Sequence, residues 1–278
     1  MLQFFAARIL RIYPALIVSV FFTVFIIGTI YTTNSLTNYL LNADIYIYII
    51  KNATFLFSLT PEYYLPGMFE SNLNHSTTIN ASLWSLPWET RLYLILGILA
   101  FVFNHKISKS VIIIAICSYL FYMLNYWFNF TGQNLQTFIR VFTLFFIGSS
   151  FFFLKDKIVM NYNRKDFFFI TLSLVIYFIL LILEDKKLLF IFYNLTLGYF
   201  VLYLAYFPSK NLIKFNNIGD YSYGLYIYSF PIQQAICVSL PNMNLIPFFI
   251  VSFSITLICA ILSWHFIEKP CLKMKTKF

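Results

Sequence analysis

A carboxylate and a guanidinium stand two residues apart at the start of an apolar segment, at Glu89 and Arg91. Charged groups inside apolar spans are costly, so by default they indicate functional sites. Pro87 suits the first position of a helix, which places Tyr93 on the same face as Glu89 and Arg91 on another. Glu89 is therefore a candidate for a polar site inside a helix bundle. The alternative is a carboxylate that only complements the positive end of the helix dipole.

Two arginines near the N-terminus, Arg8 and Arg11, are three residues apart and would share one helix face. Their guanidinium groups could bind phosphates or a pyrophosphate. Alternatively, they anchor the topology and extend to the membrane interface, and the spacing alone favours this second role. Arg140, near the outer end of its apolar segment, either lines a polar cavity or extends outward, and we favour the second.

The histidines and cysteines predict neither a catalytic triad nor a metal site, because no pair has a suitable spacing. These residues are His75, His105, His265, Cys117, Cys237, Cys259 and Cys271. We expect no metal and no bound cofactor.

The composition indicates an integral membrane protein. Of the 278 residues, 60% are apolar and 10% are charged, against roughly 25% charged in an ordinary soluble domain. Lipid can accept this excess of apolar surface. The net charge of +9 is not arranged as a basic stripe, which argues against a nucleic-acid partner. We expect an all-α, polytopic transmembrane helical bundle that forms one membrane-embedded domain over residues 1–278.

About eight apolar segments are long enough to cross a bilayer of roughly 30 Å as helices. Residues 32–83 form an outer loop, in which the short run 45–59 is expected to be interfacial or re-entrant. The first segment is long enough to span rather than to be cleaved as a signal peptide. The predicted spans lie near residues 12–31, 84–103, 110–129, 136–154, 166–183, 188–207, 219–239 and 245–267.

The distribution of positive charge predicts that both termini are cytoplasmic. With the N-terminus inside, the outside segments hold only Lys51, Lys186 and Lys187, and two arginines fall within spans. The other fourteen of the nineteen lysines and arginines then lie inside. This asymmetry follows the positive-inside rule and supports both the span count and the orientation.

Four stretches, in order along nearly the whole chain, resemble motifs of the membrane acyltransferase 3 family. In that family, paired arginines precede a proline, and an outer loop ends in a Ser-Leu-Trp-(Thr/Ser)-Leu stretch followed by a glutamate. The penultimate span and a closing motif are also similar. The matching residues are 8–14, 66–93 (with Asn80-Ala-Ser-Leu-Trp-Ser-Leu-Pro-Trp-Glu89), 219–234 and 263–270.

The resemblance implies an enzyme of the inner membrane that moves an acyl group, most often acetyl, from acyl-CoA to a hydroxyl of a cell-surface polysaccharide. Acceptors in the family include O-antigen, capsule and exopolysaccharide. By this resemblance, Glu89 is the catalytic candidate, and Trp84 and Tyr93 belong with it to the substrate site. Arg8 and Arg11 would hold the phosphates of the donor.

One departure leaves alternatives open. The family has ten spans, of which the first carries an Arg and a His expected to act as the general base. This chain begins at what resembles the third span, so we expect it to be N-terminally truncated relative to the family. None of its three histidines matches the missing one, and His265 stands where an aromatic is usual. The alternatives are an inactive remnant without the catalytic His, or a polysaccharide flippase or polymerase. No oligomeric state is predicted.

Overall fold

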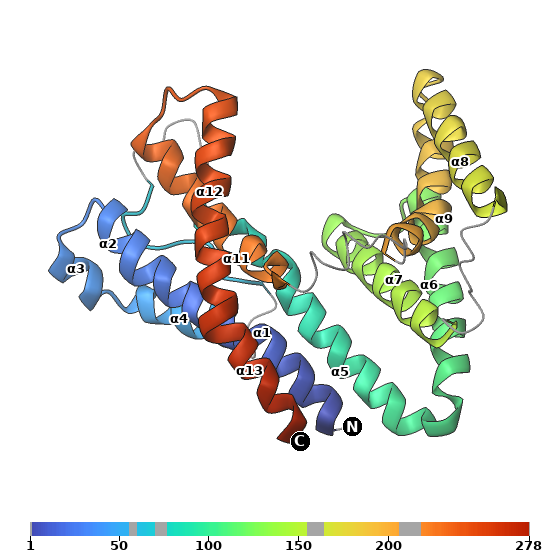
Figure 1. Cartoon of the computed structure of the whole chain (residues 1–278), viewed down its shortest axis with the longest axis horizontal. Helices are drawn as coiled ribbons and strands as arrows, with labels where there is room; N and C mark the ends of the chain where they lie inside the picture. Colours follow the sequence, from blue (N-terminus) through green and yellow to red (C-terminus); the bar gives the residue numbers. More distant parts are fainter. Residues whose placement is uncertain (1, 56–59, 70–76, 155–163, 206–217, 278) are drawn as a thin grey trace. The chain divides into compact units, whose positions relative to one another are not determined.

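The structure, a computed structural model, describes residues 2–55, 60–69, 77–154, 164–205 and 218–277 (Figure 1). The chain divides into two compact units, each described here by itself. Unit 1 comprises Met1–Gly97 and Phe215–Phe278, and unit 2 comprises Ile98–Lys214. The described residues are helical and form no strand, apart from an isolated bridge between Thr32 and Met68. The prediction of an all-α fold is therefore confirmed.

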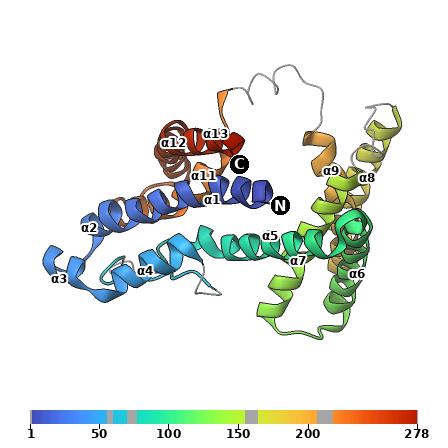
Figure 2. The same cartoon turned by 90° about the horizontal axis from the view of Figure 1, so that it is seen from below.

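Unit 1 is built around the two ends of the chain. Helix α1 (Leu2–Phe22) continues through a π-helical turn (Thr23–Ile27) into α2 (Gly28–Tyr31). It packs against α11 and α13, and Figure 2 shows α1 and α13 side by side. The other elements of unit 1 are α3 (Leu36–Leu41), α4 (Ala43–Thr54), a 3-10 turn (Ala81–Ser85) leading into α5 (Leu86–Phe103, which belongs to unit 1 as far as Gly97), α11 (Ser222–Ser239), α12 (Leu245–Ser263), a second π-helical turn (Trp264–Glu268), α13 (Lys269–Lys273) and a final 3-10 turn (Met274–Lys277).

Unit 2 consists of two helical hairpins. Helix α6 packs along α7, and α8 packs along α9. A short 3-10 turn (Asn104–Lys106) precedes α6. The bounds are α6 (Ile107–Phe128), α7 (Gln133–Leu154), α8 (Arg164–Ile182) and α9 (Lys186–Ala205).

Each of the eight predicted spans overlaps a described helix, and residues 206 and 207 of the span 188–207 lie outside the described part of the chain. Within the described part of the chain, four helical stretches are long and apolar enough to cross a membrane: Gln3–Tyr31, Ala81–Phe128, Leu135–Leu154 and Leu245–Lys273. The bent pair Lys186–Asn194 and Thr196–Leu204 gives a fifth if it forms one span. The 48-residue stretch contains both α5 and α6, which are separated at Asn104, where φ is +37°. The number eight remains a prediction.

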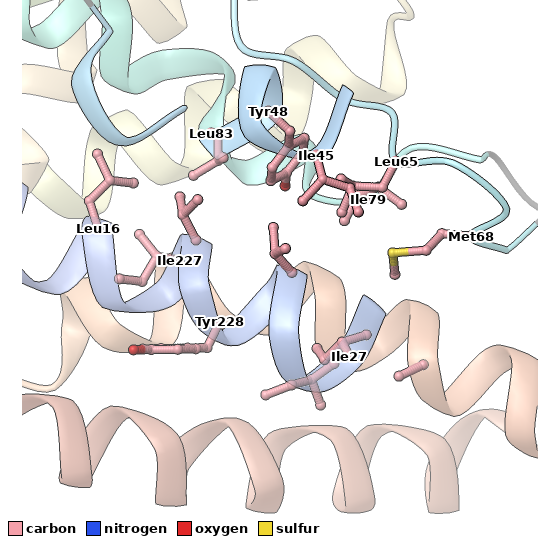
Figure 3. Close-up of a cluster of buried hydrophobic side chains, with 14 of the residues drawn as sticks. Leu16, Ile27, Ile45, Tyr48, Leu65, Met68, Ile79, Leu83, Ile227 and Tyr228 are labelled. Atoms are coloured by element: carbon pink, nitrogen blue, oxygen red, sulfur yellow. The ribbon is translucent and has the colours of Figure 1, made fainter. Parts of the chain in front are cut away.

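The core of unit 1 is formed by α1, α11 and the outer loop with its helix α4. Leu16 of α1 and Ile45 of α4 are fully buried, as is Leu65 of the loop. Figure 3 shows these side chains in one cluster with Ile227 and Tyr228 of α11. The outer loop is therefore not merely a connection, because its apolar side chains complete the packing of α1.

A tyrosine from the outer loop packs against the first π-helical turn and donates a hydrogen bond to it. Tyr39 of α3 is fully buried, and its hydroxyl donates a hydrogen bond to the Val24 carbonyl at 3.0 Å. A Cβ atom at Gly28 would lie 1.9 Å from this hydroxyl oxygen, so the close approach requires glycine. Burial raises the pKa of Tyr39 to about 12.

Polar contacts within the outer loop tie α4 to the segment around Glu62. Asn52 is fully buried and exchanges two hydrogen bonds of 2.9 Å with the backbone of Glu62. Lys51 forms an ion pair of 2.7 Å with the Glu62 side chain. With 12 residues, α4 is about 18 Å long, well short of the bilayer core. This agrees with the expectation that the run 45–59 is not a full span, although residues 56–59 lie outside the described part.

Candidate active site

Glu89 and Tyr93 form a hydrogen-bonded pair in the first two turns of α5. The Tyr93 hydroxyl donates to Glu89 Oε1 at 2.6 Å. The pairing depends on where the helix begins, because residues four apart share a face only within one continuous helix. Asn80 caps the preceding 3-10 turn by accepting from the Ser82 amide at 3.1 Å, and Pro87 is the second residue of α5. The sequence predicted this pair.

Arg8 of α1 lies against the ring of the same tyrosine. Its guanidinium carbon is 4.7 Å from the ring centre of Tyr93 and 5.5 Å from that of Phe4. A cation at this distance is attracted to the ring face. Arg8, Tyr93 and Glu89 therefore form one connected series, in which the ring contacts the cation and the hydroxyl contacts the carboxylate.

Arg11 has a different partner. Its Nη2 atom is 2.5 Å from Asp220 Oδ2, in the segment just before α11. Asp220 also accepts hydrogen bonds from the hydroxyl and the backbone amide of Ser222. These contacts fix the Asp220 carboxylate, which in turn holds Arg11 in place.

Tyr223 and Glu268, from the C-terminal part of the chain, also lie near these charged residues. The Tyr223 hydroxyl donates to the Ile12 carbonyl of α1 at 3.0 Å. Glu89, Glu268 and Arg11 all lie close enough to Tyr223 to interact with it electrostatically.

Glu268 is only 1% exposed, in the second π-helical turn. Its Oε1 atom accepts from the Ser263 hydroxyl at 3.0 Å. Its Oε2 atom has no hydrogen-bond partner among the described residues. We call the set Arg8, Arg11, Glu89, Tyr93, Asp220, Tyr223 and Glu268 the polar cluster.

The segment before α5 is tied to α11. The Tyr226 hydroxyl donates to the Ser82 carbonyl, and the Ser85 hydroxyl lies 2.7 Å from the same tyrosine oxygen. The Asn80 side chain donates to the Ile227 carbonyl at 2.9 Å. These bonds fix the first turn of α5, and with it Glu89, relative to α11.

The structure brings together most of the predicted site. Four of the predicted residues lie near one another in unit 1: Arg8, Arg11, Glu89 and Tyr93. The two arginines contact separate partners, Tyr93 and Asp220, instead of pointing at one common phosphate site. Trp84 is 38% exposed and, within the described part of the chain, makes no hydrogen bond or ring contact with the polar cluster.

Three members of the polar cluster were not predicted as site residues: Asp220, Tyr223 and Glu268. Each lies in a stretch that carries the family resemblance, 219–234 or 263–270, and that resemblance was the available signal. Two other polar groups lie elsewhere. Arg91 stacks on Trp88 at 5.2 Å, and His265 lies 3.4 Å from the Tyr221 hydroxyl.

The polar cluster can bind an anion and accept a proton. It offers guanidinium groups that suit phosphates, and a carboxylate whose orientation is fixed by a tyrosine. Among the described residues, no group of three or more His, Cys, Asp or Glu could hold a metal ion.

Comparison with known proteins gives one named relative. No protein-family profile matches the chain, and no solved structure is similar to it. The chain is 26% identical over 281 aligned positions to a protein of Shigella phage Sf6 named O-acetyl transferase. The alignment covers 98% of this chain and 77% of that protein. This similarity supports the prediction that the chain is an acyltransferase. The specific family remains a prediction.

Proposed function

We propose that this chain is a membrane-embedded O-acyltransferase that moves an acyl group, expected to be acetyl, from acyl-CoA to a hydroxyl of a cell-surface polysaccharide. The observation that carries the proposal is the alignment with the phage O-acetyl transferase, which extends over 98% of the chain. The polar cluster supports it, because the helices that the alignment spans bring an oriented carboxylate and two arginines together in unit 1.

Glu89 is the group that we propose acts on the acceptor. The acceptor hydroxyl oxygen forms a bond to the acyl carbon, the carbon–sulfur bond breaks, and CoA leaves as the thiol. The proton of the hydroxyl must be removed as the new bond forms, and a positioned carboxylate can accept it. The hydrogen bond from Tyr93 at 2.6 Å fixes the orientation of Glu89 for this step.

Arg8 is the better candidate for the donor phosphates. Arg11 is paired with Asp220, whereas Arg8 is exposed and has no ion pair with a described carboxylate. Its guanidinium group can form two parallel hydrogen bonds to a phosphate while one face stays on the Tyr93 ring. In this proposal Arg11 and Asp220 organise the site and Arg8 binds the ligand.

The proposed location is the inner membrane, with both termini cytoplasmic. The packing of α1 on α13 is compatible with this topology. The donor would then enter from the cytoplasm near Arg8, and the acceptor from the side of the outer loop.

The proposal can be tested with membranes from cells that produce the chain. They are incubated with acetyl-CoA labelled in the acetyl group and with surface glycan from the producing cells, stripped of its O-acetyl groups by mild base. The expected result is release of CoA thiol together with label in the glycan that mild base removes. Control membranes without the chain should give neither product. No transfer from membranes that contain the folded chain would overturn the proposal in favour of an inactive remnant.

A further inference from the structure

Unit 2 contains a polar cavity of about 490 Å³ between the C-terminal half of α6 and the N-terminal half of α7. This size lies within the range of roughly 300–1,000 Å³ that is typical of small-molecule sites. The cavity belongs to a different unit from the polar cluster. In the predicted topology it opens at the outer end of both helices. Such a cavity is unusual here, because the neighbouring faces of the same helices are apolar.

Four carboxamide side chains line this cavity: Asn125, Asn129, Gln133 and Gln136. A carboxamide offers donors and an acceptor together, which matches a sugar hydroxyl, itself both donor and acceptor. A phosphate only accepts, so a phosphate site would be lined mainly by donors. The lining therefore favours a sugar over a lipid headgroup.

Several of these groups are fixed in orientation. Asn125 is only 2% exposed, and its Oδ1 atom accepts from the Thr131 hydroxyl at 3.0 Å. Gln136 Nε2 donates to the Asn129 side chain and to the Thr131 carbonyl. Asn125 Nδ2 donates to no other residue in the described part of the chain. A pre-oriented polar lining lowers the ordering cost of binding.

Two tyrosines complete the wall and are held by one ring from α9. The ring of Tyr126 stacks on Phe190 at 3.6 Å, and Tyr122 meets the same ring edge-on at 5.3 Å. Tyr126 also donates to the Lys186 carbonyl at 3.4 Å. Tyrosine presents an apolar ring and a polar hydroxyl together, a combination suited to the mixed surface of a sugar.

Arg140 is the one charged side chain that lines the cavity within the described residues. No described carboxylate lies within ion-pair distance of it. The structure therefore places Arg140 at a polar cavity, the first of the two roles considered from the sequence, and its side chain is also exposed. A guanidinium group at the wall of a polar cavity can form two parallel hydrogen bonds to a carboxylate.

We propose that this cavity is a glycan subsite that takes a sugar residue bearing a carboxylate. The sugar hydroxyls bind the carboxamides, and the sugar carboxylate binds Arg140. The inference rests on the proposed function in one respect, since it takes the acceptor to be a polysaccharide. It adds that this acceptor is acidic and that it binds to the cavity of unit 2.

The test is direct binding to the full chain in nanodiscs of zwitterionic lipid, measured by calorimetry without acyl donor. The two probes are methyl β-glucuronide and methyl β-glucoside, which differ only in the carboxylate. We expect the wild type to bind the glucuronide at least about 10-fold more tightly, as for a hydrogen bond to a charged group. Arg140→Gln should abolish this preference. Lys109→Gln, which removes a charge from the opposite end of α6, should leave it unchanged.

Equal affinity of the wild type for both sugars would overturn the inference, and this comparison needs no variant. It would equally be overturned if neither sugar bound but short-chain phosphatidylglycerol bound in an Arg140-dependent way, which would indicate a lipid site. Failure of acyl transfer with the glucuronide preference intact would count against the proposed function alone. Transfer without any sugar preference would count against this inference alone.

Discussion

Tyr93 connects the two charged groups that matter most at the scale of single residues. Tyr93→Phe removes the hydroxyl that donates to Glu89 but keeps the ring on which Arg8 stacks. We expect kcat to fall roughly 10- to 100-fold, the loss of one hydrogen bond to a charged group, while KM for acyl-CoA stays unchanged. Steady-state kinetics in membranes separates the two constants. A raised KM with unchanged kcat would mean that Tyr93 serves the donor instead.

The two arginines should behave differently on substitution. Arg8→Gln should raise KM for acyl-CoA about 10-fold or more, because it removes a charge-assisted contact to phosphate. Arg11→Gln removes the ion pair with Asp220, so its main effect should be a lower melting temperature of the purified protein. Lys106→Gln, an exposed charge in the turn before α6, is the matched control and should change neither quantity. An unchanged KM for Arg8→Gln would make Arg8 a topology anchor only.

The sequence predicted contacts within one helix and missed those between helices. Spacing placed Glu89 and Tyr93 on one face, because the helical repeat alone determines that pair. It could not show that Arg8 and Arg11 have separate partners. Tyr93 lies on α5, and Asp220 lies more than 200 positions further along the chain than Arg11. Glu268 was missed for the same reason, because its position in the polar cluster depends on how α13 and α1 pack.

At the scale of elements, hydropathy was a reliable guide to where helices form. All eight predicted spans overlap helices, because a long apolar segment in a membrane must satisfy its own backbone hydrogen bonds. The two π-helical turns were not predicted. The first accepts a hydrogen bond from Tyr39 of another helix, and no local sequence pattern predicts that contact. Inside the outer loop, α4 overlaps the run 45–59 that was expected to be interfacial or re-entrant. Helix α3 was missed, because it is short and its stability comes from packing.

The contact between α11 and α12 depends on a glycine. A Cβ at Gly224 would lie 2.7 Å from the Ala260 Cα, a backbone atom that can move only with its helix. Gly224→Ala should therefore destabilise the protein by about 1–3 kcal/mol, the usual cost of overpacking.

The control is Gly148→Ala in α7, where a Cβ meets nothing within 4 Å. It should be neutral or stabilising by up to about 1 kcal/mol, since alanine favours the helix. Thermal unfolding in one detergent compares the two variants. Equal stability of the Gly224→Ala variant and the wild type would show that α11 and α12 do not pack this closely.

At the scale of the whole molecule, the central expectation is the topology. With eight spans, the turn between α8 and α9 faces outward and the turn between α5 and α6 faces the cytoplasm. In a chain whose four cysteines are replaced by serine, Glu184→Cys should react on intact cells with a membrane-impermeant maleimide. Lys106→Cys should react only after the membrane is opened. Protection of position 184 would contradict the eight-span topology.

The long-range arrangement was the least predictable from sequence. Charge asymmetry predicted that both ends lie on one side, and the packing of α1 on α13 agrees with that expectation. The outer cavity of unit 2 was not foreseen, because its lining comes from polar residues scattered over two helices that read as ordinary spans. Arg140 was the one residue whose cost in a membrane pointed there.

The most direct test of the account is acyl transfer by Glu89→Gln, measured beside Glu184→Gln, the same change in an exposed turn of unit 2. Both variants are first shown to reach the membrane at wild-type levels. The account predicts that Glu89→Gln transfers at least about 100-fold more slowly than the wild type, the usual contribution of a general base, and that Glu184→Gln transfers at the wild-type rate. A wild-type rate for Glu89→Gln would contradict the assignment of the polar cluster as the active site.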